Sequence, residues 1–283
     1  MLSQKYIDDI IYTALDEDIN YIDVTTDNLI CTEHKSEAVL VAKDSGVVCG
    51  IDIAARVFDL VGGNVEKEIL AKDGDYVKNG DIIAKFSGST RTLLKGERTA
   101  LNILQHMSGV ATATHRCVQL VQGTKARITD TRKTLPGIRR LQKYAVTVGG
   151  GKNHRYNLSD GAMLKDNHID AYGSITAAVT KLRERMGHMV KVEVEVRNFD
   201  ELQEALDCGC EIIMLDNMSL SDMKMAVSVT GGKALLEASG NITHENIREV
   251  AQTGVDIISL GALTHSVKCF DISMKIKDAK DSE

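Results

Sequence analysis

Residues 190–217, VKVEVEVRNFDELQEALDCGCEIIMLDN, decide the fold of this chain. The segment opens with alternating valines, continues with an amphipathic stretch over 199–208 and closes on an apolar run at 211–215. A strand, a helix and a second strand of these lengths form a βα repeat, and such repeats build parallel sheets covered by helices. The segment therefore predicts an α/β domain.

The same rhythm continues on both sides of this segment. Further short strands are expected at residues 127–129, 162–164, 234–238 and 257–259, and helices at 174–186, 219–229 and 244–253. Six such units can close into a barrel or form an open doubly wound sheet. Because no G-x-G-x-x-G motif follows the first strand, we expect a closed or nearly closed barrel.

The first hundred residues follow a different pattern, which indicates an α+β unit. An amphipathic helix is expected over 7–15, and further elements are a hairpin of 38–42 with 47–51, strands at 65–70 and 81–86, and helices at 96–106 and 111–121.

Charge is distributed unevenly along the chain. The net charge is −6, yet residues 127–168 hold nine Lys and Arg against three Asp, a local balance of +6, so the remainder carries −12. A basic island in an acidic protein indicates a localised anion site. Binding of RNA to this island remains an alternative, although only Tyr144 and Tyr156 could stack on bases there.

The composition of the chain also indicates the cellular compartment in which the protein is expected. No apolar run reaches the roughly 18–20 residues of a membrane span, and residues 1–10 carry Lys5, Asp8 and Asp9 where a secretory signal would be apolar. The six cysteines show neither disulfide-framework nor zinc-site spacing. These features predict a cytoplasmic protein with free thiols.

Polar residues or glycines stand at the end of every expected barrel strand. In a βα barrel these ends meet on one face, where active sites lie. We therefore expect the functional residues in six segments: Asp130-Thr131-Arg132-Lys133, Lys165-Asp166-Asn167-His168, Glu193 with Glu195, Asp216-Asn217, Ser239-Gly240-Asn241 and Ser259-Leu260-Gly261.

Some of these residues have a purely structural alternative. Lys165 at a barrel mouth needs an anionic partner, whereas His168 could simply cap the following helix. Glu193 and Glu195 alternate with valines, so both should face the barrel interior and need cations such as Lys165 and Arg155. In the basic run, Arg132 and Lys133 could belong to a solvated loop, and Arg139, Arg140 and Lys143 are expected on a solvated helix face.

Two glycine-containing segments suggest contacts to an anion. Backbone N–H groups at Gly240 and Gly261, with helix N-termini behind them, suit a phosphate, although a simple turn would also explain Ser239-Gly240-Asn241. Residues 149–155, GGGKNHR, are expected to form a flexible cationic loop that could close over an anionic ligand.

Eight ordered motifs give the chain a resemblance to quinolinate phosphoribosyltransferase, the carboxylating nicotinate-nucleotide pyrophosphorylase of NAD synthesis. The motifs are GERTALN at 96–102, DTRKT at 130–134, GKNHR at 151–155, LKDNH at 164–168, VEVEV at 192–196, LDN at 215–217, EASGNI at 237–242 and SLGALTH at 259–265. One departure is Ile22, which stands where the family usually has a glycine before its Asp-x-Thr-Thr segment.

The resemblance implies a pentosyltransferase that joins quinolinate to phosphoribosyl pyrophosphate and releases pyrophosphate and CO2. It implies an N-terminal α/β sandwich at residues 1–110, completed by the tail 266–283, and an open α/β barrel of about six βα units at 111–265 that holds the active site. It also implies a homodimer, Mg²⁺ as cofactor, and neither nucleic acid nor membrane as partner. A relative on the same scaffold, associated with molybdenum transport, and a Schiff-base aldolase using Lys165 are the competing enzyme classes.

The resemblance also assigns roles to residues. Lys165, Glu195 and Asp216 would be catalytic, with the two carboxylates as possible Mg²⁺ ligands. Quinolinate would be bound by Arg98 of the neighbouring subunit together with Thr131, Arg132, Lys133, His154, Arg155 and Lys165. The phosphoribosyl donor would be bound by Lys133, Glu195, Asp216, Ser239, Gly240, Asn241, Ser259, Leu260 and Gly261.

Overall fold

The computed structural model describes residues 2–278. The described chain forms two compact units, the first from residues 2–115, 135–150 and 266–278, and the second from 116–134 and 151–265. Residues 266–278 thus join the first unit, while 279–283 of the expected tail lie outside the described residues. Residues 135–150, which we expected within the barrel, lie in the first unit. Within residues 2–278, no helix combines the length and apolar character that a bilayer crossing requires.

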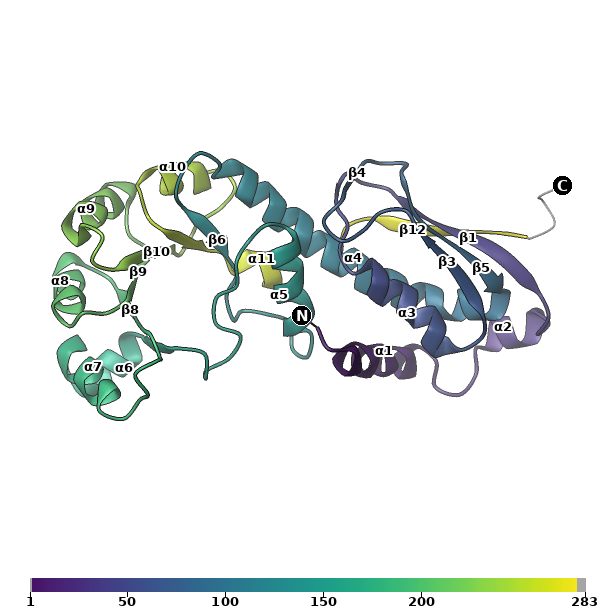
Figure 1. The fold of residues 1–283 in the computed structure, drawn as a ribbon, viewed down its shortest axis with the longest axis horizontal. Helices are drawn as coiled ribbons and strands as arrows, with labels where there is room; N and C mark the ends of the chain where they lie inside the picture. Colours follow the sequence, from purple (N-terminus) through teal and green to yellow (C-terminus); the bar gives the residue numbers. More distant parts are fainter. Residues whose placement is uncertain (1, 279–283) are drawn as a thin grey trace. The chain divides into compact units, whose positions relative to one another are not determined.

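The first unit is built on a four-stranded antiparallel sheet of order β12-β1-β5-β3. Tail strand β12 pairs with β1, and the two run side by side in Figure 1. Alternate residues of β1 are buried, among them Ala38 and Leu40, so one face of the sheet carries the core. The strands are β1 (Lys35–Ala42), β3 (Val65–Ile69), β5 (Ile82–Ser89) and β12 (Ile272–Asp278), beside the short pair β2 (Gly46–Val47) and β4 (Tyr76–Val77).

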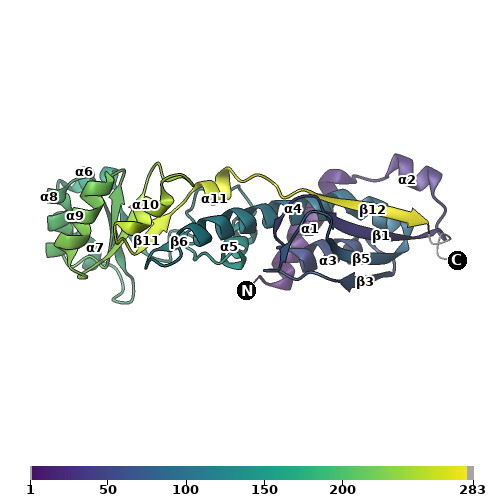
Figure 2. The same ribbon diagram turned by 90° about the horizontal axis from the view of Figure 1, so that it is seen from above.

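Helices pack on this buried face. Phe58 of α3 and Phe86 of β5 are both buried, with ring centroids 4.8 Å apart. The helices of the unit are α1 (Gln4–Asp18), α2 (Val24–Leu29), α3 (Ile51–Val61), the first part of α4 (Thr90–Leu120) and α5 (Arg139–Val148), and they can be followed in Figure 2.

The expected hairpin of residues 38–42 with 47–51 is wrong. Strand β1 pairs with β5 and β12, whereas β2 pairs with β4. Residue Gly50 adopts a left-handed φ of 92° and α3 begins directly after it, because the Asp73 carboxylate accepts hydrogen bonds from the N–H groups of Gly50 (2.8 Å) and Ile51 (3.1 Å). This cap comes from a distant residue, so the local pattern could not reveal it.

The two helices expected at 96–106 and 111–121 are one continuous helix, α4. The suspected break contains Ser108 and Gly109. The hydroxyl of Ser108 accepts a hydrogen bond from Cys49 N (2.9 Å), and a Cβ on Gly109 would lie 2.4 Å from the Lys268 carbonyl oxygen. Both residues serve close packing of the helix, so neither ends it.

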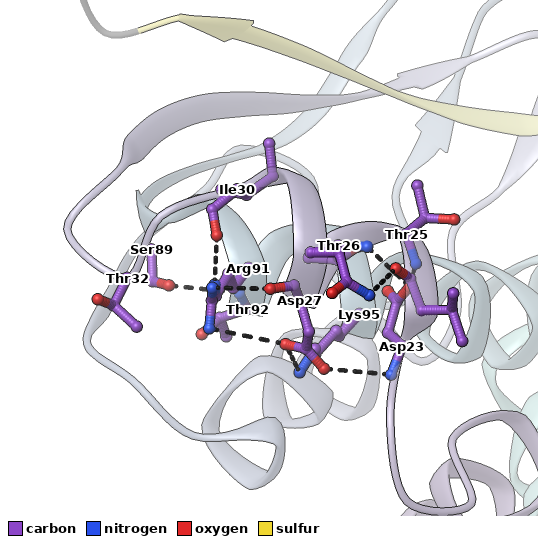
Figure 3. Close-up of polar contacts among 12 residues, drawn as sticks. Asp23, Thr25, Thr26, Asp27, Ile30, Thr32, Ser89, Arg91, Thr92 and Lys95 are labelled. Carbon is purple, nitrogen blue, oxygen red and sulfur yellow. Dashed lines mark hydrogen bonds and ion pairs between the residues drawn. The ribbon is translucent and has the colours of Figure 1, made fainter.

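A polar cluster joins α2 to the start of α4 (Figure 3). The carboxylate of Asp23 caps α2 by accepting from Thr26 N at 2.9 Å, although Ile22 replaces the usual glycine before it. The carboxylate of Asp27 pairs with Lys95 at 2.6 Å, and Arg91 donates to the Ile30 carbonyl at 2.7 Å.

The second unit contains a six-stranded sheet whose paired strands are all parallel, in the order β6-β11-β10-β9-β8-β7. The strands are β6 (Arg127–Thr129), β7 (Ala162–Leu164), β8 (Val192–Val196), β9 (Ile212–Asp216), β10 (Leu235–Ser239) and β11 (Ile257–Ser259). Since β6 and β7 are the two ends of this order, the barrel is open. The predicted α/β class and the open barrel of six strands that the resemblance implies are confirmed, and the sheet is not a closed barrel.

Helices cover the outer side of this curved sheet in Figure 1. The helices of this unit are α6 (Asp166–Tyr172), α7 (Ile175–Arg183), α8 (Phe199–Asp207), α9 (Leu220–Thr230), α10 (Ile247–Gln252) and α11 (Ala262–His265). The β8 residues Val192, Val194 and Val196 are fully buried. The alternating glutamates of the same strand therefore point to the opposite, inner face.

Candidate active site

The inner face of the second unit surrounds a cavity of about 460 Å³. It is lined by Thr131, Arg132, Lys133, His154, Arg155, Met163, Lys165, Glu195, Met214, Asp216, Glu237, Ser239 and Ser259. Ten of these residues were singled out in the sequence, and they come from segments up to 128 positions apart. The barrel topology brings them together because parallel strands present their carboxyl ends on the same side.

Five of the residues to which the resemblance assigned a role do not line this cavity. Gly240, Asn241, Leu260 and Gly261 follow the ends of β10 and β11, next to the lining residues Ser239 and Ser259. Arg98 lies exposed on α4, in the first unit.

Lys165 has the anionic partner that its position requires. Its Nζ lies 2.6 Å from Glu195 Oε2, and the lysine side chain is about half exposed while that of Glu195 is mostly buried. The neighbouring His168 caps α6, because its Nδ1 accepts from the backbone N–H of Lys165 at 3.0 Å. The capping alternative for His168 thus describes the structure.

The segment 149–155 is anchored by its backbone, contrary to the expected flexible loop. A Cβ on Gly149 would lie 2.4 Å from the Ala111 carbonyl oxygen, so the segment packs closely against α4. The N–H of Lys152 donates to the Ile128 carbonyl at 2.8 Å, and Asp130 Oδ1 accepts from the backbone N–H of the next lining residue, 154, at 2.9 Å. The cations of this segment are therefore held in fixed positions beside β6.

A buried cluster of one histidine and two carboxylates lies at the cavity. Nε2 of His154 is 3.1 Å from Glu193 Oε2 and 3.6 Å from Glu237 Oε1, while its Nδ1 accepts from Arg155 N at 2.7 Å. We expected Arg155 to neutralise Glu193, but the arginine instead donates to the Gly161 carbonyl at 2.9 Å. The imidazole of His154 therefore lies beside carboxylates of both β8 and β10.

Burial changes the acid–base behaviour of this cluster. Burial and the nearby charge of Glu193 raise the pKa of Glu237 to about 7. Burial opposes protonation of His154, but Glu193 and Glu237 outweigh it and raise the pKa of the imidazole. Burial lowers the pKa of the Arg155 guanidinium, which still stays charged. A partly protonated Glu237 leaves the cavity more cationic near neutral pH.

The phosphate contacts expected at Gly240 and Gly261, with a helix N-terminus behind each glycine, are only partly as predicted. Gly240 is left-handed, with a φ of 92°, but α10 begins at Ile247, so no helix N-terminus stands directly behind this glycine. Gly261 does lie directly before α11, and a Cβ on it would come within 3.1 Å of the Lys133 side chain.

Part of the basic run lies away from the cavity. The prediction that Arg139, Arg140 and Lys143 lie on a solvated helix face is wrong for Lys143. Lys143 is completely buried within the first unit, whereas Arg140 is exposed and stacks over the Tyr6 ring at 5.1 Å.

Two groups of side chains could hold a metal ion. The ligand atoms of His154, Glu193 and Glu237 lie within 4.8 Å of one another, but they already pair among themselves. The carboxylates of Glu195 and Asp216 line the cavity at the ends of adjacent strands. Hard oxygen donors of this kind suit Mg²⁺, which typically uses one or two carboxylates and completes its shell with substrate phosphates and water.

Charge is divided across the cavity by strand. Four invariably charged cations face three carboxylates, with His154 in addition. The cations come from β6, β7 and segment 149–155, and the carboxylates Glu195, Asp216 and Glu237 come from central strands β8, β9 and β10. Such a cavity offers cations that can bind a polyanion and, close to them, carboxylates that can stabilise developing positive charge.

Sequence reasoning missed three lining residues: Met163, Met214 and Glu237. Glu237 lies within a strand body and before the polar strand end that we searched. Its signal is a carboxylate inside an otherwise apolar strand, LLEAS at 235–239, and the same signal had identified Glu193 and Glu195.

Comparison with known families matches both halves of the chain. Residues 23–108 match the quinolinate phosphoribosyl transferase N-terminal domain, and residues 110–275 match the C-terminal domain of the same family. A probable nicotinate-nucleotide pyrophosphorylase [carboxylating] of Bacillus subtilis is 44% identical over 266 residues, covering 94% of this chain and 92% of that protein. The nicotinate-nucleotide pyrophosphorylase [carboxylating] of Mycobacterium leprae is 42% identical over 274 residues, covering 95% and 96%.

Solved structures agree with these matches. The crystal structure of NadC from Streptococcus pyogenes superposes with a TM-score of 0.95 at 41% identity, over 98% of this chain and 99% of that one. The nicotinate-nucleotide pyrophosphorylase from Francisella tularensis superposes with a TM-score of 0.94 at 39% identity, over 98% of each chain.

Proposed function

The chain belongs to the quinolinate phosphoribosyltransferase family, and on this premise we propose that it converts quinolinate and phosphoribosyl pyrophosphate to nicotinate mononucleotide, pyrophosphate and CO2. The observation that carries the proposal is the cavity in which cations and carboxylates occupy separate strands. The family match favours this reaction over the aldolase and RNA-binding alternatives that the sequence left open.

Arg132, Arg155 and Lys165 are proposed to bind the two carboxylates of quinolinate, with Thr131, Lys133 and His154 completing the pocket. A dicarboxylate held by fixed cations presents its ring nitrogen in one direction. The nitrogen lone pair then forms a bond to C1 of the ribose as the bond from C1 to the pyrophosphate oxygen breaks.

Departure of pyrophosphate leaves positive charge on the ribose ring. The carboxylates of Glu195 and Asp216, on the adjacent strands β8 and β9, would stabilise that charge. Once the ring nitrogen is alkylated, the carbon–carbon bond to the adjacent carboxylate breaks, CO2 leaves, and the electron pair stays on the ring carbon until a proton is taken up. This step needs little from the protein beyond placement.

The phosphoribosyl donor is assigned to the end of the cavity formed by β9, β10 and β11. Lys133, Ser239 and Ser259 line that part of the site, and Gly240, Asn241, Leu260 and Gly261 continue the same loops. Glu195 and Asp216 would hold Mg²⁺, which would neutralise charge on the departing pyrophosphate.

We further propose a homodimer in which Arg98 acts on the neighbouring subunit's site. Its exposure on α4 and its absence from the lining of the described cavity support a role in trans.

All six cysteines are free thiols, which supports a reducing, cytoplasmic location.

The decisive experiment is a coupled assay that follows pyrophosphate and CO2 release with quinolinate and phosphoribosyl pyrophosphate. Nicotinate serves as the matched control, because it lacks the carboxylate next to the ring nitrogen. We expect turnover with quinolinate that far exceeds turnover with nicotinate. Equal rates with the two acids, or none with quinolinate, would contradict the proposal.

A further inference from the structure

Two asparagines have an unusual backbone conformation beside the cavity. Among residues 2–278, Asn217 and Asn241 are the non-glycine residues with positive φ, at 53° and 51°. Each closely follows a cavity-lining residue, Asp216 at the end of β9 and Ser239 at the end of β10. Such a conformation is unfavourable for a residue with a side chain and persists where surrounding contacts impose it, often at functional sites.

The side-chain amide of Asn217 connects the two strand ends. Its Nδ2 donates to Asp216 Oδ2 at 3.0 Å, and its Oδ1 accepts from Asn241 Nδ2 at 2.9 Å. The backbone N–H of Asn217 also donates to the Ser239 carbonyl at 3.0 Å. Because a carboxylate only accepts, the amide nitrogen must face Asp216, which leaves the amide oxygen for Asn241.

The glycine between Ser239 and Asn241 makes room for this amide. A Cβ on Gly240 would lie 2.2 Å from Asn217 Oδ1, so any other residue would push the amide out of its place. The glycine also adopts a φ of 92°, which only glycine reaches without strain. Asn217, Gly240 and Asn241 therefore form one interlocked unit.

We propose that Asn217 is a positioning residue, which orients the Asp216 carboxylate into the cavity and fixes it to the Ser239–Asn241 loop. An isolated carboxylate at a strand end has several rotamers, and a hydrogen bond from a fixed amide selects one of them. The inference rests on the proposed function, since it takes the phosphoribosyl donor as the ligand of these loops. Asn217 itself need not touch that ligand.

The test compares Asn217→Ala and Asn217→Asp with Asn198→Ala in the full-length protein. Asn217→Asp retains an acceptor but loses the donor to Asp216. Asn198 is a matched control, because it follows the adjacent strand β8 and only caps α8, accepting from Glu201 N at 2.9 Å. We expect both Asn217 variants to raise the KM for phosphoribosyl pyrophosphate by about tenfold or more, equivalent to about 1.4 kcal/mol, with the KM for quinolinate changed less than about twofold.

The dissociation constant of phosphoribosyl pyrophosphate is measured by calorimetry as a second readout. A general loss of stability would not weaken the binding of this substrate selectively. Gly240→Ala should weaken binding in the same way, and adding it to Asn217→Ala should have little further effect, because both disturb one unit. Additive losses, equal rises in both KM values, or Asn217 variants that match Asn198→Ala would each overturn the inference. A wild-type protein that neither binds nor consumes phosphoribosyl pyrophosphate would instead refute the proposed function.

Discussion

At Lys165 a strand-end cation meets the carboxylate of Glu195 at 2.6 Å, inside the proposed substrate cavity. Replacing Lys165 with alanine removes a cation from the dicarboxylate pocket and leaves Glu195 without this partner. We expect turnover to fall by at least about 10²-fold, the usual scale for losing one charge-stabilising group, with the circular dichroism spectrum unchanged.

Lys181→Ala is the control for this change, since Lys181 forms a comparable ion pair with Glu184 at 2.7 Å outside the cavity. Wild-type kcat/KM in Lys165→Ala would remove Lys165 from the mechanism.

Glu237 makes the stability of the fold sensitive to pH. The pKa of its carboxyl is about 7 in the folded protein against an ordinary value of 4.5, so between these values the folded state keeps a proton that the unfolded chain has lost. The raised pKa of His154 changes the unfolding free energy in the same direction. The protonated imidazole stabilises the folded state beside the two glutamates, and this stabilisation is lost as the pH rises. The unfolding free energy should therefore decrease from pH 5 to pH 8, through Glu237 by at most about 3 kcal/mol.

Glu237→Gln cannot ionise, so its melting temperature should fall less steeply over this range than that of the wild type. The exposed Glu245→Gln serves as control. Parallel curves for Glu237→Gln and wild type would show that this carboxylate does not cause the slope.

Helix α4 depends on a close backbone approach at Gly109. Alanine usually stabilises a helix relative to glycine by about 1 kcal/mol, but here its Cβ would lie 2.4 Å from the Lys268 carbonyl oxygen. We expect Gly109→Ala to lower the free energy of unfolding by about 1–3 kcal/mol, as overpacking does. Gly187→Ala, where a Cβ meets nothing within 4 Å, should be nearly neutral in the same urea titration. A more stable Gly109→Ala protein would disprove the steric explanation.

Elements whose signal is local were predictable, and those fixed by distant residues were not. The strands at Ala162–Leu164 and Ile257–Ser259 match their expected bounds, because apolar residues between polar turns define them. The start of α3 escaped prediction because its cap comes from Asp73. Within the candidate site, the polar strand ends led to most lining residues, whereas Glu237 escaped because it lies in the middle of β10, two residues before the polar strand end.

On the scale of the whole molecule, the charged residues that line the cavity lie far apart in the sequence. A chain of net charge −6 lines one cavity with Arg132, Lys133, Arg155 and Lys165. The open sheet makes this possible, because the strands at its two ends supply cations and the central strands supply acids. Folding, and not local sequence, therefore gathers these charges in one cavity.

The proposed sharing of Arg98 between subunits can be tested by mixing two inactive variants. Arg98→Ala and Lys165→Ala homodimers each lack one group at both sites, but a mixed dimer contains one site with both groups and one with neither. Random exchange gives about half mixed dimers with one intact site of two, so activity should recover to roughly a quarter of wild type. Exchange is verified by native mass spectrometry, and each variant incubated alone is the control. Mixed dimers without activity would place Arg98 in its own subunit's site, and an Arg98→Ala homodimer that is active by itself would place Arg98 outside catalysis.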